Sequence, residues 1–149
     1  MKKTQKKDNS ATNLAKAIIK GIQEKKGHEI VCLNLTKINS TVCDYFIICH
    51  GDSHPQVDAI ADSIEEQTCK FVNEKPWHRE GIQNTEWVLL DYVNIVVHVF
   101  LKEKRDFYNI EGLWADSVKM KILENGSIKL LAGKPKKNRV KRVKKLIKD

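Results

Sequence analysis

The chain lacks most of the features that define metal-binding, disulfide-rich, secreted and membrane proteins. No CxxC pair occurs among Cys32, Cys43, Cys49 and Cys69, and the five histidines show no ligand spacing with them. Because a metal site needs three or four convergent ligands, we expect reduced, mostly buried thiols, no metal and no cofactor. No apolar run reaches the roughly 20 residues of a membrane span, and none follows the basic start MKKTQKK. A cytoplasmic protein without a membrane segment is therefore expected.

Positive charge is present in excess, but it is concentrated at the two ends. The formal net charge of the 149 residues is +8. Residues 1–8 hold four Lys and one Asp, and residues 134–149 hold nine Lys or Arg and one Asp, which leaves 14 basic and 17 acidic side chains in residues 9–133. The sequence predicts a single, mildly acidic domain over residues 10–133. It lies between a flexible basic N-terminus at 1–9 and a basic C-terminal tail at 134–149.

Apolar periodicity predicts the order of elements in the first half. It indicates a helix from about Thr12 to Lys26, closed by Gly27 at the C′ position, and strands over residues 29–35 and 44–50 with a polar turn between them. Ser53, Pro55 and Gln56 have the spacing of a helix N-cap with a capping box. The helix that follows has an apolar stripe of Val57, Ile60, Ala61, Ile64 and Thr68, opposite an acidic face of Asp58, Asp62, Glu65 and Glu66.

In the second half, a polar loop over residues 72–86 leads to a hairpin, and a helical segment follows from near Lys102 to about Asp116, interrupted at Gly112. A last hairpin is expected about Asn125-Gly126, with Ile122 set against Lys129. The alternation of helices and strands predicts an α/β fold: one domain with a mixed β-sheet and flanking helices.

The stretch from Trp87 to Trp114 is the most specific part of the sequence. A tight turn at Val93-Asn94 would set Trp87 opposite Phe100, Leu89 opposite His98 and Asp91 opposite Val96. One face of this hairpin, formed by Val88, Leu90, Tyr92, Ile95, Val97 and Val99, is predicted to be core. The other is apolar and aromatic but carries a carboxylate and an imidazole, which is typical of a surface for a partner.

Several enzymatic interpretations can be weighed against the same residues. Gly51-Asp52-Ser53, at a strand-to-helix junction, could cradle a phosphate, but no strand-borne pair of carboxylates for divalent ions accompanies it. Cys49 with His50, or Ser53 with His54, could be a nucleophile and base, although neighbours on a strand rarely point at one another. Asp91 and His98 lack a third polar member. A helix cap, core residues and a non-enzymatic protein are the favoured interpretations.

The chain closely resembles one known family, the ribosomal silencing factors, also called the RsfS or Iojap family. The resemblance rests on Val42 to Ile48, on Gly51 and Ser53 with Gln56-Val57 and Ala59 to Asp62, and on Glu80-Gly81. Its strongest part is the set Trp87, Leu89 to Tyr92, Val96 to Phe100, Arg105, Tyr108, Glu111 and Leu113 to Asp116. Val93 departs from the pattern, since the family usually has Gly at that turn, and the basic tail beyond Gly133 extends past the shared region.

The resemblance implies a nucleotidyltransferase-like fold without catalytic carboxylates. It also implies a non-enzymatic protein that binds the large ribosomal subunit through large-subunit ribosomal protein fourteen, blocks joining of the small subunit and represses translation when nutrients are scarce. Two alternatives remain open: an RNA-binding adaptor in assembly of the large subunit, and a catalytic nucleotidyltransferase relative. A homodimer away from the ribosome is a further possibility.

The residues expected to act on this basis form two groups. The expected partner-binding residues are Trp87, Asp91, His98, Phe100, Arg105, Tyr108 and Trp114. The aromatic members would anchor the partner, Asp91 would pair with one of its cations, and Arg105 and His98 would orient polar contacts. Core packing is an alternative for Trp114 and Phe107, and an internal pair is an alternative for Asp91 and Arg105. The second group would contact ribosomal RNA from the tail: Lys136, Lys137, Arg139, Lys141, Arg142, Lys144 and Lys145.

Overall fold

The computed structural model describes residues 2–38, 43–125 and 128–132, and its seven strands form one mixed sheet. The strands lie in the order β3-β4-β5-β2-β1-β6-β7, and β2 and β5 are parallel neighbours while the other adjacent strands pair antiparallel. The helices are α1 (Lys2–Glu24), α2 (His54–Val72), α3 (Lys102–Tyr108) and α4 (Ile110–Leu113). The strands are β1 (His28–Asn34), β2 (Tyr45–Gly51), β3 (His78–Glu80), β4 (Trp87–Asp91), β5 (Ile95–Leu101), β6 (Val118–Ile122) and β7 (Ile128–Ala132). The predicted single α/β domain with a mixed sheet is confirmed.

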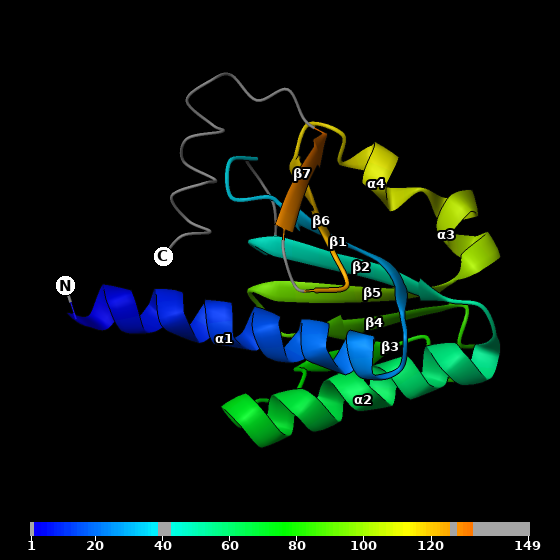
Figure 1. The fold of residues 1–149 in the computed structure, drawn as a ribbon, viewed down its shortest axis with the longest axis horizontal. Helices are drawn as coiled ribbons and strands as arrows, with labels where there is room; N and C mark the ends of the chain where they lie inside the picture. The colour runs from blue at the N-terminus through cyan, green and yellow to red at the C-terminus, as the bar shows by residue number, and fades with distance from the viewer. Residues whose placement is uncertain (1, 39–42, 126–127, 133–149) are drawn as a thin grey trace.

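The helices divide the core into two layers. Figure 1 shows α1 and α2 side by side along one face of the sheet, while α3 and α4 lie at the other face. In the first layer, Leu14, Ile18 and Ile22 of α1 and the apolar stripe of α2 pack against the sheet. Their partners on β4 and β5 include Val88, Leu90, Val97 and Val99. The second layer contains Phe46, Val96, Phe100 and Ile110. Strand β5 runs between them and is buried at six of its seven positions, as expected for a central strand covered on both faces.

Two capping interactions fix the junction between α1 and α2. Ser53 is the N-cap of α2, and its side chain accepts a hydrogen bond from the backbone N–H of Gln56, as the sequence predicted. The Gln56 side chain departs from the expected capping box. Its Oε1 accepts from the backbone N–H of Asp52 at 2.7 Å, and its Nε2 donates to the carbonyls of Lys25 and Lys26 at the end of α1. Gln56 thereby joins the start of one helix to the end of the other.

Gly27 does not occupy the C′ position that the sequence suggested. The left-handed residue is Lys26, with φ of 58°, and Gly27 follows it with its N–H donating to the carbonyl of Ile22 at 2.9 Å. A side chain at Gly27 would meet the Ile22 side chain at 2.4 Å, so glycine is needed here for space. The helix also begins earlier than its apolar stripe, because the polar residues from Lys2 onwards continue it.

The segment 72–86, predicted as a loop, contains the short edge strand β3, which pairs with β4. Its three side chains are all exposed, so no burial pattern marks the strand in the sequence. Gly81 turns the chain between β3 and β4 with φ of +78°, and a Cβ there would lie 1.9 Å from the carbonyl oxygen of Trp87. Only glycine fits this turn.

Two details of the second half differ from expectation. The segment from Lys102 onwards breaks at Asn109, which has φ of 44° and ends α3 while its side chain caps α4, rather than at Gly112. The terminal hairpin exists, but Ile122 pairs with Ile128, and Lys129 pairs with Lys121. Among the described helices, none has an apolar stretch that could span a membrane.

Candidate partner-binding surface

The hairpin of β4 and β5 has the predicted register. Trp87 pairs with Phe100, Leu89 with His98 and Asp91 with Val96. The turn depends on Val93, whose φ of +77° is rare for a β-branched residue. Two hydrogen bonds hold it: the Val93 N–H donates to Asp91 Oδ1 at 2.8 Å, and the Asn94 N–H donates to the Tyr92 carbonyl at 3.0 Å. The Asp91 side chain is therefore part of the turn that sets the register.

The outer face of this hairpin is built as a stack of rings with a buried floor. Phe100 is fully buried and His98 is 4% exposed. Trp87 stacks on Phe100 with ring centroids 5.0 Å apart, and its Nε1 donates to His98 Nδ1 at 3.0 Å. His98 and Phe100, both expected at the partner interface, thus support Trp87 from beneath and present almost no surface of their own.

The hydrogen bond from Trp87 requires an unprotonated Nδ1 on His98. Burial lowers the pKa of His98 to about 4, because the charged imidazolium is disfavoured away from water. The ring is consequently neutral at physiological pH and carries its proton on Nε2. That nitrogen is buried and meets no hydrogen-bond partner among the residues that the structure describes.

Exposed aromatic surface lies above this floor, on α3. Tyr108 is 44% exposed and sits 4.8 Å from the Trp87 ring, and Phe107 is 76% exposed and contacts Tyr108 edge-on. Trp114, at the end of α4, packs its ring edge-on against Phe46 and remains partly exposed. We call Trp87, Phe107, Tyr108 and Trp114 the aromatic face. Core packing, considered for Phe107 from its helical spacing, is wrong, because the short α3 turns this side chain to solvent.

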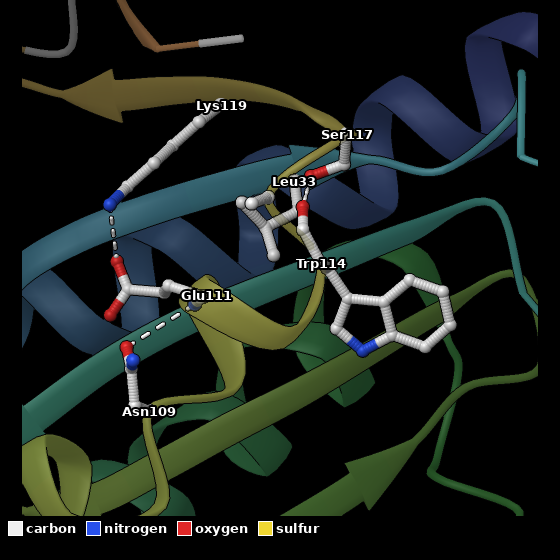
Figure 2. Close-up of a pocket in the computed structure, with 8 residues that line it drawn as sticks. Leu33, Asn109, Glu111, Trp114, Ser117 and Lys119 are labelled. Carbon is white, nitrogen blue, oxygen red and sulfur yellow. Dashed lines mark hydrogen bonds and ion pairs between the residues drawn. The ribbon is translucent and has the colours of Figure 1, made fainter.

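A pocket of about 270 Å³ opens beside Trp114, between α4 and strands β1 and β6. Figure 2 shows Trp114 on one side and the Glu111–Lys119 ion pair, at 2.9 Å, on the other. Its walls are formed by Leu33, Asn109, Glu111, Gly112, Trp114, Ala115, Ser117 and Lys119. The pocket therefore extends the aromatic face with a concave, partly charged region.

Arg105 does not face a partner. It is 6% exposed, and its guanidinium donates to Glu111 Oε2 at 3.0 Å, to the Glu29 carbonyl at 2.8 Å and to His50 Nδ1 at 2.9 Å. Glu29 belongs to a bulge where β1 has one residue more than β2. Its backbone has φ of 46°, and its carbonyl oxygen lies within hydrogen-bonding distance of the Arg105 guanidinium. Arg105 thus fastens α3 to the sheet, and the suggested pair with Asp91 is not formed.

Charges around Arg105 stabilise each other. Burial raises the pKa of Glu111, but hydrogen bonds and charge from Arg105 and Lys119 outweigh it, so the pKa lies below its usual value. Burial and the neighbouring Arg105 cation lower the pKa of His50. Glu111 is thus ionised and His50 neutral at physiological pH, the states in which both bind the guanidinium.

The residues considered for catalysis have structural partners. Asp52 Oδ2 lies 2.9 Å from His28 Nε2, and the Ser53 hydroxyl is the helix cap described above. Cys49 is fully buried and burial raises its pKa to about 12, so it is a thiol at neutral pH. All four cysteines are free thiols, and Cys69 is exposed. Within residues 2–38, 43–125 and 128–132, no three His, Cys, Asp or Glu side chains gather as a metal site requires.

Sequence reasoning did not predict that Phe107 of α3 and Leu113 of α4 would be 76% and 75% exposed. Spacing alone does not reveal which apolar side chains a broken helix leaves in water. The seven cations proposed for RNA contact, Lys136, Lys137, Arg139, Lys141, Arg142, Lys144 and Lys145, lie outside the described residues.

Comparisons with known proteins identify the family. The model described as "Ribosomal silencing factor during starvation" matches residues 8–147, which extends beyond Gly133 into the basic tail. A ribosomal silencing factor RsfS of Halalkalibacterium halodurans is 37% identical over 108 residues, covering 72% of this chain and 91% of that protein. One from Bacillus subtilis is 43% identical over 95 residues, covering 63% and 78%. A crystal structure from Chromobacterium violaceum superimposes with a TM-score of 0.64 at 36% identity, covering 69% of this chain and 84% of that one. The chain belongs to the RsfS family of ribosomal silencing factors.

Proposed function

We propose that this protein represses translation by binding the large ribosomal subunit through large-subunit ribosomal protein fourteen and sterically blocking the small subunit. Nutrient limitation is the condition in which it would act. The role is that of a binding protein: the bound domain occupies space that the small subunit needs, and no chemical step is required. Membership of the ribosomal silencing family supports the role.

The observation that carries the proposal is the aromatic face. Tyr108 and Phe107 expose aromatic surface next to Trp87, whose indole is oriented by His98 and stacked on Phe100. Aromatic side chains held rigidly at a surface lose little conformational entropy on binding, and they are enriched among the residues that dominate interface affinity. The adjoining pocket at Trp114 offers a recess for a side chain of the partner.

Carboxylates around the aromatic face suit a basic ribosomal protein. Asp106 and Asp116 are exposed beside the aromatic residues of α3 and α4, and Asp91 is half-buried at the hairpin turn. The rim also carries positive charge, since Lys104 Nζ lies 5.8 Å from the Phe107 ring centroid. Carboxylates at the rim of an apolar patch attract a basic partner and fix its orientation more than they add affinity. Asp91 therefore remains the proposed contact for a partner cation, although one of its oxygens already accepts from Val93.

Sedimentation with purified subunits tests the proposal. The full-length protein should travel with the large subunit and reduce its joining to the small subunit. Phe107→Ala combined with Tyr108→Ala should lose both properties, because it removes the exposed rings and leaves the floor intact. Trp77→Ala is the matched control, since it removes an aromatic side chain that is 82% exposed and, among the described residues, contacts no ring of the aromatic face. Equal binding by the double variant and wild type, both folded, would reject the aromatic face as the interface.

Two further results would favour the alternatives. Binding to naked ribosomal RNA as tight as to intact subunits would indicate an RNA adaptor. Calorimetric binding of a nucleotide with a divalent ion near Gly51 would indicate a catalytic relative. Failure to sediment with large subunits under any condition would reject the proposed function itself.

A further inference from the structure

A second surface, on the opposite side of the sheet from the aromatic face, combines lysines with an exposed phenylalanine. It lies where the middle of α1 meets the C-terminal end of α2 (Figure 1). Phe71 is 52% exposed, and Lys20 Nζ lies 4.4 Å and Lys70 Nζ 5.5 Å from its ring centroid. A pocket of about 270 Å³ adjoins the ring and is lined by Asn13, Lys16, Ala17, Lys20, Phe71 and Val72.

The charge of this surface differs from the rest of α2. Further toward its N-terminus, α2 exposes Asp58, Asp62 and Glu66, but no acidic residue lines the pocket at its C-terminal end. In a domain whose folded part carries more acidic than basic side chains, the local positive charge around Phe71 is therefore a distinct feature. A local basic patch of this kind favours a polyanion as ligand.

The spacing along α1 places three of the pocket residues in one line. Lys16 and Lys20 are four residues apart on the helix, and Asn13 precedes Lys16 by three. Residues at such steps lie on one side of a helix. Asn13, Lys16 and Lys20 therefore follow one side of α1 over a length of about 10 Å at 1.5 Å per residue.

We infer that this surface, which we call the α1–Phe71 surface, binds a segment of single-stranded RNA. Its lysines neutralise the phosphates, and the Phe71 ring and its pocket receive a base. Every nucleobase has an apolar face that stacks on an aromatic ring and an edge that hydrogen-bonds to an amide such as Asn13. A phospholipid headgroup would use the lysines but not the ring and amide together, and an acidic peptide would place a ring in the pocket only where it carries an aromatic residue, whereas RNA has a base at every phosphate.

The contact between Lys20 and Phe71 does not prevent stacking. An exposed cation–π contact is weaker than the stacking of a base on a ring. When a phosphate attracts the Lys20 ammonium, the side of the ring that the ammonium covered becomes available. Binding therefore exchanges a weak internal contact for two stronger ones.

Fluorescence anisotropy with the full-length protein and a short labelled single-stranded RNA of mixed sequence tests the inference. The logarithm of the association constant should fall with the logarithm of the salt concentration, with a slope of about −0.7 for each phosphate contacted. Lys16→Gln with Lys20→Gln should weaken binding and flatten the slope by about 1.4. Lys37→Gln with Lys102→Gln removes the same charge from exposed positions elsewhere and should leave the slope unchanged.

Phe71→Ala separates base stacking from charge. It should weaken RNA binding by about fivefold or more and leave the binding of inorganic polyphosphate, which has no bases, unchanged. Melting temperatures show whether each variant is folded. The inference is overturned if the Lys16 and Lys20 double variant keeps the wild-type slope, or if anionic phospholipid vesicles bind more tightly than RNA and Phe71→Ala has no effect on RNA. Because none of these residues belongs to the aromatic face, either surface can fail without the other.

Discussion

Val93 is the residue on which the register of the hairpin depends, and its conformation is costly. A β-branched side chain at φ of +77° is strained by on the order of 1–2 kcal/mol. The flanking hydrogen bonds to Asp91 and Tyr92 hold the turn nonetheless, since the register keeps Val88, Leu90, Val97 and Val99 in the core. The energy of burying one whole face of two strands outweighs the strain of one residue.

Val93→Gly should therefore stabilise the protein by roughly 1 kcal/mol. Glycine removes the strain, and Val93 is 48% exposed, so little buried apolar surface is lost. Val93→Ala is the matched control, because it shortens the side chain but keeps the Cβ that causes the strain. Urea unfolding measures both. A Gly variant no more stable than the Ala variant would mean that the turn stores no strain.

His98 makes stability depend on pH. Its pKa is about 4 in the folded protein and 6.5 for the free side chain, so the unfolded chain binds more protons between these values. The stabilisation is complete above pH 6.5 and is lost as the pH falls toward 4, by on the order of 3 kcal/mol. His98→Asn, whose amide oxygen can accept from Trp87 in place of Nδ1, should reduce this fall. The free energy of unfolding across this range checks it, with exposed His78→Asn as the control; identical pH profiles for His98→Asn and wild type would exclude the role.

At the scale of elements, periodicity predicted most of the fold and missed the places where tertiary contacts override it. The α2 stripe, the hairpin register and the Ser53 cap follow from spacing, because burial on one face and local hydrogen bonds determine them. Strand β3 carries no apolar alternation, since its side chains are exposed and only its backbone pairs with β4. The break at Asn109 directly follows the short helix α3, which Arg105 anchors to a bulge 76 residues away in the chain.

The difference between local spacing and long-range tertiary contacts also explains which site residues were predicted correctly. Sequence position showed correctly that Trp87, His98, Phe100 and Tyr108 belong together, but not which would be covered. Phe100 and His98 lie beneath Trp87 by the hairpin register, and α3 adds to their cover, since its Tyr108 ring contacts both Trp87 and Phe100. Arg105 holds α3 there through Glu29 and His50, which are distant in the chain, so no local signal in the sequence shows that α3 covers the hairpin.

The close packing of α1 on α2 depends on Gly21. A Cβ there would lie 2.7 Å from Ile64 Cα and 2.9 Å from Ile64 N, which are backbone atoms that cannot move aside. Gly21→Ala gains up to about 1 kcal/mol of helix propensity, but forcing the helices apart should cost about 1–3 kcal/mol, so the variant should be less stable. Thermal melting checks this. Asn13→Ala, at an exposed α1 position, gains propensity without a clash and should not lower the melting temperature; a Gly21→Ala variant as stable as wild type would show that the helices separate freely.

At the scale of the whole molecule, charge is divided between a mildly acidic domain and a basic tail. The folded part has 17 acidic and 14 basic side chains, and the nine cations of residues 134–149 exceed that imbalance. An acidic domain that presents aromatic rings suits a basic ribosomal protein, whereas a basic tail suits the RNA around it. Under the proposed function, the aromatic face would select the site on the large subunit, and the tail would add affinity without sequence preference.

Deleting residues 134–149 should accordingly weaken binding to the large subunit and flatten its dependence on salt, by a slope of about one for each phosphate that the tail no longer neutralises. Replacing Lys136, Lys137, Arg139, Lys141, Arg142, Lys144 and Lys145 by Gln is the matched control for chain length and should have most of the same effect, because it neutralises seven of the nine cations and charge rather than the presence of the tail is responsible. Sedimentation at several salt concentrations measures both. A tail that only improves solubility would leave binding unchanged at low and moderate salt. Weaker binding that does not vary with salt would instead mean that the tail touches the subunit through uncharged groups.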